Sequence, residues 1–344
     1  MRGLIVTKEH EVRLVDDIPM PKIGEYEALV KMSCCMICNG TDREIIQGKL
    51  AEAQEYPLVL GHEGAGRVIR TGDRVRSFWP GDLVVRPCLL DAGKYRSAWG
   101  GFAEYGIVVD TQALREDGQK RAYDPCGLTQ QVVPAGIRPE QASLMITLKE
   151  TLSAVRRIGL SPEDNVLIVG DGPVGLCMLY NCLLSGIRNV SVLGNRPENL
   201  KRARQIGAME CYHNRKEEDH RRLEADWAGR LNCYIDTVGN QETIQQGMRL
   251  TEEDGTVAVY GLGIGDRLVL SMDGIRNRKL QFVQWPINEL ERETHSFIAD
   301  AVLSGRIDTD LLITHVLPIE DYKKGFEAIQ NKEAVKVALT FSCS

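Results

Sequence analysis

The chain has 344 residues, a formal net charge of −6 and hydrophobic residues at 43% of its positions. Because a usual domain has ~100–200 residues, we expect two domains. The sequence contains no Lys/Arg run, which argues against nucleic acid as a partner, and no apolar run of the ~18 residues that a membrane span needs. The first residues, MRGLIVTKEHEVRLV, lack the apolar stretch of a signal peptide. Ten scattered cysteines do not resemble a disulfide framework, so we expect free thiols in a reducing cytoplasm.

The first third of the chain is predicted to consist of strands and turns. GLIVT and EVRLVDD, at 3–7 and 11–17, have the pattern of a hairpin, and EALVKMSCC at 27–35 alternates. Further short strands are expected within 59–85 and 100–109, where Gly and Pro interrupt apolar runs. This part therefore predicts a β-rich domain.

From about residue 140 the pattern changes to alternating strands and helices. Residues 138–160 have helical spacing, with Pro139 suited to a helix start and Gly159 to a helix stop. The strands NVLIV, NVSVLG, NCYIDTVG and GTVAVYGLG then alternate with helical segments, which predicts a parallel sheet with right-handed crossovers. A helix is expected at about 287–304. The last stretch, 305–341, mixes strand and helix and is compatible with a return to the first domain.

A glycine turn lies between the strand NVLIV and the apolar helix VGLCMLYNCLL. Its residues, Gly170, Asp171, Gly172, Pro173, Val174 and Gly175, fit G-x-G-x-x-G in the strand–turn–helix context that the motif requires. The first glycine permits the turn, the second lets a pyrophosphate approach, and the third allows close helix–strand packing. The helix N-terminus favours the phosphates. We therefore predict a dinucleotide site; the alternative is a tight βα turn without a ligand.

The end of the second parallel strand bears on which dinucleotide binds. NAD-binding proteins place Asp or Glu there for the ribose 2′-hydroxyl, whereas this chain has Gly194, followed by Asn195 and Arg196. A guanidinium can bind a 2′-phosphate with two hydrogen bonds, and Arg202 is a weaker second candidate. We therefore expect NADP(H) rather than NAD(H). Alternatively, Arg196 is a solvated residue at a helix start.

Cys38, His62 and Glu63 form a candidate metal site. Cys38 ends a predicted strand, and His62 and Glu63 lie in the glycine-rich segment VLGHEGAGRV. Thiolate, imidazole and carboxylate are the ligand types that zinc accepts, and a catalytic zinc site keeps one position open. Spacing alone also allows a structural role for each of the three.

Ordered motifs along almost the whole chain resemble the zinc-dependent medium-chain dehydrogenase/reductase superfamily of alcohol, polyol and sugar dehydrogenases. They are MICNGTD, LGHEGAGRV, GDLVV, GGFAEYGIV, VLIVGDGPVGL, YIDTVG and LITHVLPIEDYKKGFEAI. The resemblance is strongest to the sorbitol and glucose dehydrogenases. It implies that Cys38 and His62 bind a catalytic zinc, that Glu63 is a ligand or a neighbour of the ligands, and that Thr41 contacts the substrate hydroxyl. It also adds Val238 and Gly261 to the cofactor-binding residues.

The same resemblance implies an α/β architecture of two domains. Residues 1–148 and 295–344 would form a GroES-like, β-rich catalytic domain, and residues 149–294 an inserted Rossmann domain with a doubly wound parallel sheet. The zinc would lie in the cleft between them. Relatives form dimers or tetramers, so we expect a homodimer or homotetramer that associates through GTVAVYGLG and the segment after it.

The sequence departs from the family pattern in four places. An extra residue separates Cys38 from Thr41. Only Cys88 stands where many relatives have four closely spaced cysteines, so we predict no structural zinc. Ile146 replaces a later zinc-site residue, while Glu150, one helical turn on, could reach the metal directly or through a water, or be an exposed helix residue. Residues 114–131 form a polar insertion, either a flap or an oligomer contact.

These residues predict an enzyme that moves a hydride between a secondary alcohol of a polyol, sugar or cyclitol and NAD(P). A simple alcohol or aldehyde is the second choice of substrate. The rivals are a zinc-free quinone or enoyl reductase of the same superfamily and a non-catalytic NADPH-binding protein. Candidate pocket residues, each of which could instead be surface or packing, are Asn39, Arg43, Glu44, Glu104, Trp99 and Trp285.

Overall fold

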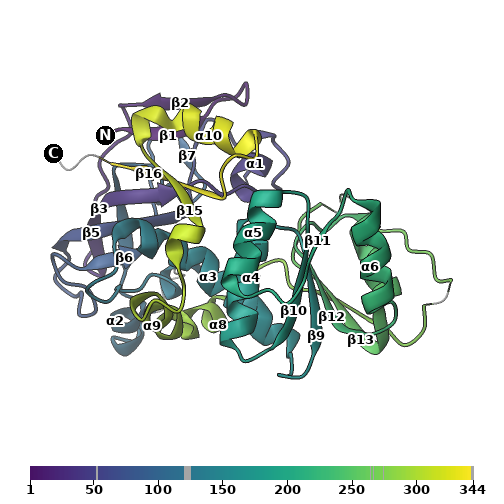
Figure 1. Cartoon of the computed structure of the whole chain (residues 1–344). Coiled ribbons are helices and arrows are strands. Elements are labelled where there is room, and N and C mark those ends of the chain that lie inside the picture. The colour runs from purple at the N-terminus through teal and green to yellow at the C-terminus, as the bar shows by residue number, and fades with distance from the viewer. Residues whose placement is uncertain (52, 120–124, 264, 266, 274, 342–344) are drawn as a thin grey trace. The chain divides into compact units, whose positions relative to one another are not determined.

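The computed structural model describes residues 1–51, 53–119, 125–263, 265, 267–273 and 275–341 (Figure 1). The chain forms two compact units. The first unit is Met1–Ile146 with His295–Ser344, and the second unit is Thr147–Thr294. Among the described residues, no helix combines the length and the apolar character that crossing a membrane requires.

The first unit contains two sheets. A four-stranded sheet has the order β2-β1-β4-β7, and a second sheet has the order β15-β16-β3-β5-β6, with β8 also paired to β3. The strands of the first sheet are β1 (Gly3–Val6), β2 (Val12–Val15), β4 (Leu58–Val59) and β7 (Arg96–Ser97). Those of the second are β3 (Glu27–Met36), β5 (Glu63–Thr71), β6 (Leu83–Val85), β8 (Tyr105–Val109), β15 (Ile313–Pro318) and β16 (Lys336–Thr340).

Pairing within the first unit confirms two expectations. β1 and β2 pair antiparallel, as the predicted hairpin requires. The C-terminal stretch returns to the first unit, because β16 pairs antiparallel with β3 and places Leu339 opposite Cys35. α10 (Tyr322–Gln330) connects β15 to β16 and buries Tyr322 and Ala328 in the same core. The strand that precedes Cys38, β3, is therefore held in place by a strand from the C-terminal end of the chain.

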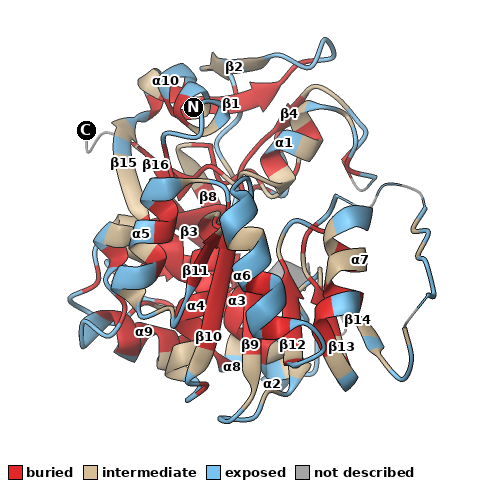
Figure 2. Cartoon of the chain, turned by 45° about the vertical axis from the view of Figure 1, so that its right-hand side comes forward, coloured by how far each residue is buried: buried red, intermediate tan, exposed pale blue. Residues whose placement is uncertain are grey.

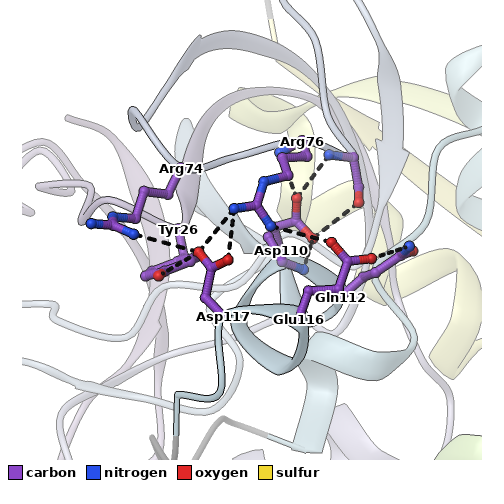
Figure 3. Close-up of polar contacts among 9 residues, drawn as sticks. Tyr26, Arg74, Arg76, Asp110, Gln112, Glu116 and Asp117 are labelled. Carbon is purple, nitrogen blue, oxygen red and sulfur yellow. Dashed lines mark hydrogen bonds and ion pairs between the residues drawn. The ribbon is translucent and has the colours of Figure 1, made fainter.

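A polar network fixes α2 (Thr111–Glu116) against the loop before β6 (Figure 3). Asp110 caps the helix by accepting from the Ala113 N–H at 2.9 Å, and it also accepts from the backbone N–H groups of Arg76 and Ser77 at 2.7 Å. Asp117, just after the helix, pairs with Arg76 at 2.7 Å. The predicted insertion, 114–131, begins in this helix and includes a short 3-10 helix, Pro125–Leu128, while residues 120–124 lie outside the described residues.

The second unit is a single six-stranded sheet of order β11-β10-β9-β12-β13-β14, with every neighbouring pair parallel. The strands are β9 (Asn165–Val169), β10 (Asn189–Gly194), β11 (Cys211–His213), β12 (Leu231–Asp236), β13 (Thr251–Val259) and β14 (Lys279–Phe282). Counted along the chain this is the 3-2-1-4-5-6 order of the Rossmann fold, which confirms the predicted parallel sheet. Ligands of such sheets bind outside the carboxyl ends of the strands, here β9 and β12.

Helices cover both faces of this sheet. α4 (Pro173–Leu184) and α5 (Pro197–Ile206) lie together on one face and α6 (Glu217–Trp227) on the other, and α7 (Gln241–Leu250) links β12 to β13 (Figure 1). The central strands are buried on both sides (Figure 2), which explains their nearly continuous apolar sequences.

The helix predicted after the β-rich region is present, and the helix predicted near residue 287 is divided. α3 (Pro139–Ile158) begins at Pro139 and ends before Gly159, whose φ is +76°. In place of one helix over 287–304 there are α8 (Asn288–Glu293) and α9 (His295–Leu303). The Thr294 hydroxyl between them donates to the Glu291 carbonyl at 2.7 Å, a local bond of the type that competes with helix continuation.

Candidate metal and cofactor sites

The structure brings Cys38, His62 and Glu63 together. One ligand atom of each lies within 4.8 Å of the others, which makes this trio a group able to hold a metal ion in the described part of the chain. Cys38 follows the end of β3, and Glu63 begins β5. Gly61 turns the chain before His62 with φ +99°, and a Cβ there would lie 2.6 Å from the Phe102 backbone nitrogen. Glycine is therefore required at position 61, where the chain packs against the backbone of Phe102.

Burial separates Cys38 from the cysteines beside it in SCCMIC. Burial raises the pKa of Cys34 to about 12 and the pKa of Cys35 well above its usual range. Cys38 is only half-buried. Because the thiolate is the metal-binding form, Cys38 is the member of this segment best suited to be a ligand.

Asp42 faces the His62 ring at ion-pair distance, without a hydrogen bond between them. Its Oδ1 lies 3.5 Å from His62 Nδ1, and its Oδ2 accepts from the Cys38 backbone N–H at 2.9 Å. The other ring nitrogen, Nε2, lies 3.9 Å from Glu63 Oε1. A carboxylate on one imidazole nitrogen fixes the tautomer that leaves the opposite nitrogen free for a metal. Asp42 lies within the motif MICNGTD, but the sequence alone indicated no role for it.

The electrostatics of the trio favour a positive charge. Burial lowers the pKa of His62, but Cys38 and Asp42 raise it by more, so this pKa lies well above its usual range. The Trp99 ring packs against the His62 ring with centroids 5.3 Å apart. A divalent cation satisfies such an anionic donor set without requiring a proton on the imidazole. Trp99 also lines a cavity of about 540 Å³ that the trio does not line.

Lys336 is a neighbour of the trio that sequence reasoning missed. Its ammonium donates to Glu63 Oε2, and both side chains are only 2% exposed. The Ser143 hydroxyl donates to the Glu63 carbonyl oxygen. The one signal in the sequence was a lysine inside the apolar strand AVKVALTF, because a buried lysine needs a paired carboxylate.

The remaining predicted residues of the first site lie at separate positions. Thr41 is the first residue of α1 (Thr41–Ile46), three residues after Cys38. Ile146 is fully buried in α3, and Glu150 is half-buried one turn later on that helix, within the second unit. Cys88 is buried, with the Gln130 amide nitrogen 3.4 Å from its sulfur.

Candidate pocket residues have varied surroundings. Asn39 Oδ1 is buried without a hydrogen bond among the described residues. Glu104 pairs with Arg2 at 2.7 Å, and Arg43 lies 3.7 Å from Glu44. In the second unit, Trp285 is 47% exposed.

The glycine turn has the geometry that its motif predicts. Gly170 follows β9 with φ +110°, and a Cβ on Gly175 would lie 1.9 Å from the Gly170 carbonyl oxygen. Gly172 caps α4, with Pro173 and Val174 in its first turn. A Cβ on Gly172 would have one neighbour within 4 Å, Arg196 Nη2 at 3.5 Å. The turn is therefore closed at its first and third glycines and open at its second, the position at which the motif predicts the approach of a pyrophosphate.

Val238 and Gly261 lie together at the carboxyl ends of β12 and β13. A Cβ on Gly261 would be 2.2 Å from the Val238 carbonyl carbon. Thr237 bonds the Val169 carbonyl through both its N–H and its hydroxyl, at 2.9 and 2.8 Å. The loops after β9, β12 and β13 therefore form one surface, and Val238 is 41% exposed on it.

Arg196 lies at the end of β10 and is bound by Asp171 of the glycine turn. Its Nε lies 3.2 Å from Asp171 Oδ1, and its Nη2 donates to the Asp171 carbonyl oxygen at 2.7 Å. Arg202 Nη1 donates to Asn199 Oδ1 at 3.0 Å. Asn195 is exposed beside them. Sequence reasoning identified these positions but not the link to Asp171.

Comparisons with known proteins agree with this geometry. The alcohol dehydrogenase GroES-like domain matches residues 24–116, and the zinc-binding dehydrogenase domain matches residues 173–297. Sorbitol dehydrogenase of Ovis aries is 26% identical over 98% of this chain and 95% of its own length. L-galactonate-5-dehydrogenase of Escherichia coli K12 is 26% identical over 94% of each chain. The structure of alcohol dehydrogenase TADH from Thermus sp. ATN1 superposes with a TM-score of 0.79 at 22% identity, covering 99% of this chain and 100% of that one.

The two domain matches together cover more than half of the chain. The GroES-like match lies within the first unit, and the zinc-binding dehydrogenase match lies almost entirely within the second unit. They confirm the expected combination of a GroES-like domain and a Rossmann-type domain. The chain belongs to the zinc-dependent alcohol and polyol dehydrogenases of the medium-chain dehydrogenase/reductase superfamily.

Proposed function

We propose that this enzyme transfers a hydride between a secondary alcohol of a polyol, sugar or cyclitol and NADP(H), at one zinc held by Cys38, His62 and Glu63. The observation that carries the proposal is the convergence of these three side chains within 4.8 Å. When bound, zinc supplies Lewis acidity at the alcohol oxygen, and the nicotinamide supplies or accepts the hydride. A single metal is proposed because Cys88 alone represents the cysteines of a structural zinc site.

Around this metal the chain's own residues orient the ligands and handle the proton. Asp42 orients His62. Lys336 binds Oε2 of Glu63, which leaves Oε1 facing His62 and available to the metal. We assign to Thr41 the hydrogen bond to the substrate hydroxyl. Glu150, which is half-buried on α3, is proposed to act on the metal site through a water and to carry the proton toward solvent.

A polyhydroxylated substrate is supported by two lines of argument. Both relatives named above act, by their names, on chains with several hydroxyls. In addition, Asn39 Oδ1 is a buried acceptor without a bond among the described residues, and such a group gains from a hydroxyl donor. A simple alcohol would leave this acceptor unbonded.

The choice of NADP(H) is supported by the end of β10. Gly194 supplies no carboxylate for a ribose 2′-hydroxyl, and Arg196 lies beside Gly172 at the mouth of the glycine turn. Gly170, Gly172 and Gly175 would receive the pyrophosphate, with Val238 and Gly261 lining the nicotinamide side.

The test is a substrate screen that follows the absorbance of the reduced nicotinamide, run with both cofactors and with measured zinc content. We expect polyol oxidation, faster with NADP, by protein that retains about one zinc per chain. Activity on quinones or enoyl compounds in zinc-free protein would replace the proposal with the zinc-free reductase. NADPH binding without turnover of any substrate class would replace it with the non-catalytic protein.

We further propose that the enzyme is a cytoplasmic homodimer or a homotetramer built from such dimers, with contact through β14. Eight cysteines are free thiols in the structure, namely Cys34, Cys35, Cys38, Cys88, Cys177, Cys182, Cys211 and Cys233, which suits a reducing compartment. β14 is an edge strand, and several exposed apolar side chains lie on it or in the adjoining segments: Leu262, Val269, Met272, Phe282, Trp285 and Ile287. Light scattering of wild type and Phe282→Asp tests this, with a monomeric wild type as the contradicting result.

A further inference from the structure

The glycine turn supplies a carboxylate at the place where β10 lacks one. A Cβ on Gly194 would lie 2.5 Å from Asp171 Cβ and 2.7 Å from Asp171 Oδ2, so the Asp171 side chain fills the space that a larger residue 194 would need. Gly194 is not at a positive φ. Glycine is therefore required here for space and not for backbone conformation. The two features are therefore linked: the glycine that leaves β10 without a carboxylate also makes room for the Asp171 carboxylate.

Asp171 is too enclosed and too fully bonded to serve a ribose. Its side chain is 8% exposed. Oδ2 accepts from the backbone N–H groups of Asn195 and Arg196 at 3.1 and 2.6 Å, and Oδ1 lies 3.2 Å from Arg196 Nε. The two N–H groups are at the start of α5, where a carboxylate is favoured by the helix dipole. The negative charge of Asp171 is thus largely offset by donors that face it.

The same contacts hold the Arg196 guanidinium by one edge. Nε and Nη2 point to the Asp171 carboxylate and carbonyl oxygens, so the edge formed by these two nitrogens is occupied. A guanidinium has five N–H donors in a fixed plane. The Nη1 group and the second hydrogen of Nη2 have no partner in the described part of the chain, and together they form the fork that binds phosphate oxygens bidentately.

A second cation is tied into the same arrangement. Asn199 Nδ2 donates to the Asp171 carbonyl oxygen at 2.7 Å, while Asn199 Oδ1 accepts from Arg202 Nη1 at 3.0 Å. Asn199 is 4% exposed, so this link is fixed. Arg196 and Arg202 are therefore both anchored, directly or through Asn199, to Asp171.

From this geometry we infer that Asp171 is a positioning residue for cofactor choice: it orients the Arg196 fork toward the 2′-phosphate of NADP(H), and Gly194 provides the room for it. The inference rests on the proposed use of NADP(H). Asp171 acts through Arg196 and does not touch the phosphate. Its removal weakens recognition of the 2′-phosphate while leaving the adenosine and 5′-phosphate contacts in place.

The test measures binding of two cofactor fragments by calorimetry: adenosine 2′,5′-bisphosphate, which carries the 2′-phosphate, and 5′-AMP, which lacks it. Wild type is expected to prefer the bisphosphate by at least about tenfold, and Arg196→Ala to lose that preference. Asp171→Asn, which keeps the size of the side chain, is expected to lower the preference about fivefold to tenfold with 5′-AMP binding unchanged. Glu198→Gln and Arg204→Ala, exposed on the same helix, are the matched controls and should behave as wild type.

The outcomes separate the inference from the proposed function. If wild type shows no preference and Arg196→Ala changes nothing, the NADP(H) proposal fails and the inference fails with it. If Arg196→Ala abolishes a clear preference but Asp171→Asn retains or increases it, only the inference fails, because Asp171 is then a repelling charge. If Asp171→Asn loses the same amount of affinity for both fragments, Asp171 stabilises the glycine turn as a whole. That result would also overturn the inference.

A reciprocal variant gives an independent measurement. Asp171→Gly combined with Gly194→Asp returns the carboxylate to β10, where it can accept from a ribose 2′-hydroxyl. We expect this double variant to bind 5′-AMP more tightly than the bisphosphate and to have a lower KM for NAD than for NADP. Retention of the wild-type preference would contradict the inference.

Discussion

Glu63 and Lys336 form an ion pair inside the first unit, between residues 273 positions apart in the sequence. One partner is a candidate zinc ligand, and the other lies on β16, which pairs with β3 next to the site. The C-terminal return of the chain thus completes the surroundings of the candidate metal site. Charges this enclosed are tolerated when they are paired.

We predict that Lys336→Met strongly destabilises the first unit, because it leaves the Glu63 carboxylate buried without its ammonium partner. Breaking a buried pair from one side costs about 3–5 kcal/mol of unfolding free energy. Urea denaturation of the metal-free protein measures this. The double variant Lys336→Met with Glu63→Gln is the control and should recover a large part of the loss; a single variant as stable as wild type would contradict the pairing.

Asp42→Asn is predicted to weaken zinc binding about 10- to 100-fold, because residues that orient a ligating histidine typically contribute this much. The amide retains the size of the carboxylate but no longer attracts a proton to His62 Nδ1. Competition with a zinc chelator measures the affinity. Asp91→Asn, which changes an exposed carboxylate, should retain wild-type affinity, and equal affinities of the two variants would show that Asp42 does not orient the ring.

The second and third glycines of the turn are predicted to fail in different ways when changed to alanine. Gly175→Ala places a Cβ 1.9 Å from the Gly170 carbonyl oxygen, so we expect loss of about 1–3 kcal/mol or more of stability from the overpacking. Gly172 has φ −77°, and an added Cβ would have one neighbour within 4 Å, Arg196 Nη2 at 3.5 Å, which is an ordinary contact distance. Gly172→Ala should therefore fold as wild type but bind NADP(H) at least about tenfold more weakly. Thermal melts and cofactor titrations distinguish the two, and unchanged binding by Gly172→Ala would contradict the assigned cofactor site.

Asp110 gives a pH-dependent prediction. Burial raises its pKa, but hydrogen bonds from the backbone N–H groups of Ala113, Arg76 and Ser77 lower it by more, so the folded-state pKa lies below the ordinary 3.8. The stabilisation is therefore complete above about pH 5 and is lost progressively as the pH falls through the lowered folded-state value. Asp110→Asn should cost about 1–3 kcal/mol at pH 7, because the amide nitrogen cannot accept from the backbone N–H groups that one of the carboxylate oxygens binds.

The cost of Asp110→Asn should be the same at pH 5 and should shrink below pH 4, as followed by urea denaturation. Glu116→Gln, which removes an exposed pair with Arg76 at 3.2 Å, is the control and should cost less than about 0.5 kcal/mol. A cost that already disappears between pH 7 and pH 5 would contradict the lowered pKa.

Local signals in the sequence predicted a large part of the fold. The glycine turn, the start of α3 at Pro139 and the alternating strands of the second unit are each encoded within a few residues. For this reason the parallel sheet could be predicted from the residues, whereas the return of the C-terminal stretch was expected from the family resemblance. The division between α8 and α9 was not predicted, and the hydroxyl bond of Thr294 does not by itself explain it, since Thr151 makes the same kind of bond within the continuous helix α3.

The candidate sites were predictable in their residue types but not in their connections. The ligand types of Cys38 and His62, together with the family resemblance, indicated ligands, but only the folded chain shows that Asp42 faces His62 and that Lys336 reaches Glu63. Similarly, the absence of a carboxylate at Gly194 was visible in the sequence, whereas its replacement by Asp171 depends on two segments 23 positions apart meeting in space.

The central claim, that Cys38, His62 and Glu63 hold a catalytic zinc, is tested most directly by measuring zinc content together with polyol oxidation in Cys38→Ser. Cys35→Ala, which removes a buried thiol on β3 outside the trio, is the control. We predict about one zinc per chain and full activity in wild type and in the control, and loss of both in Cys38→Ser. A Cys38→Ser enzyme that oxidises polyols as fast as wild type would contradict the account.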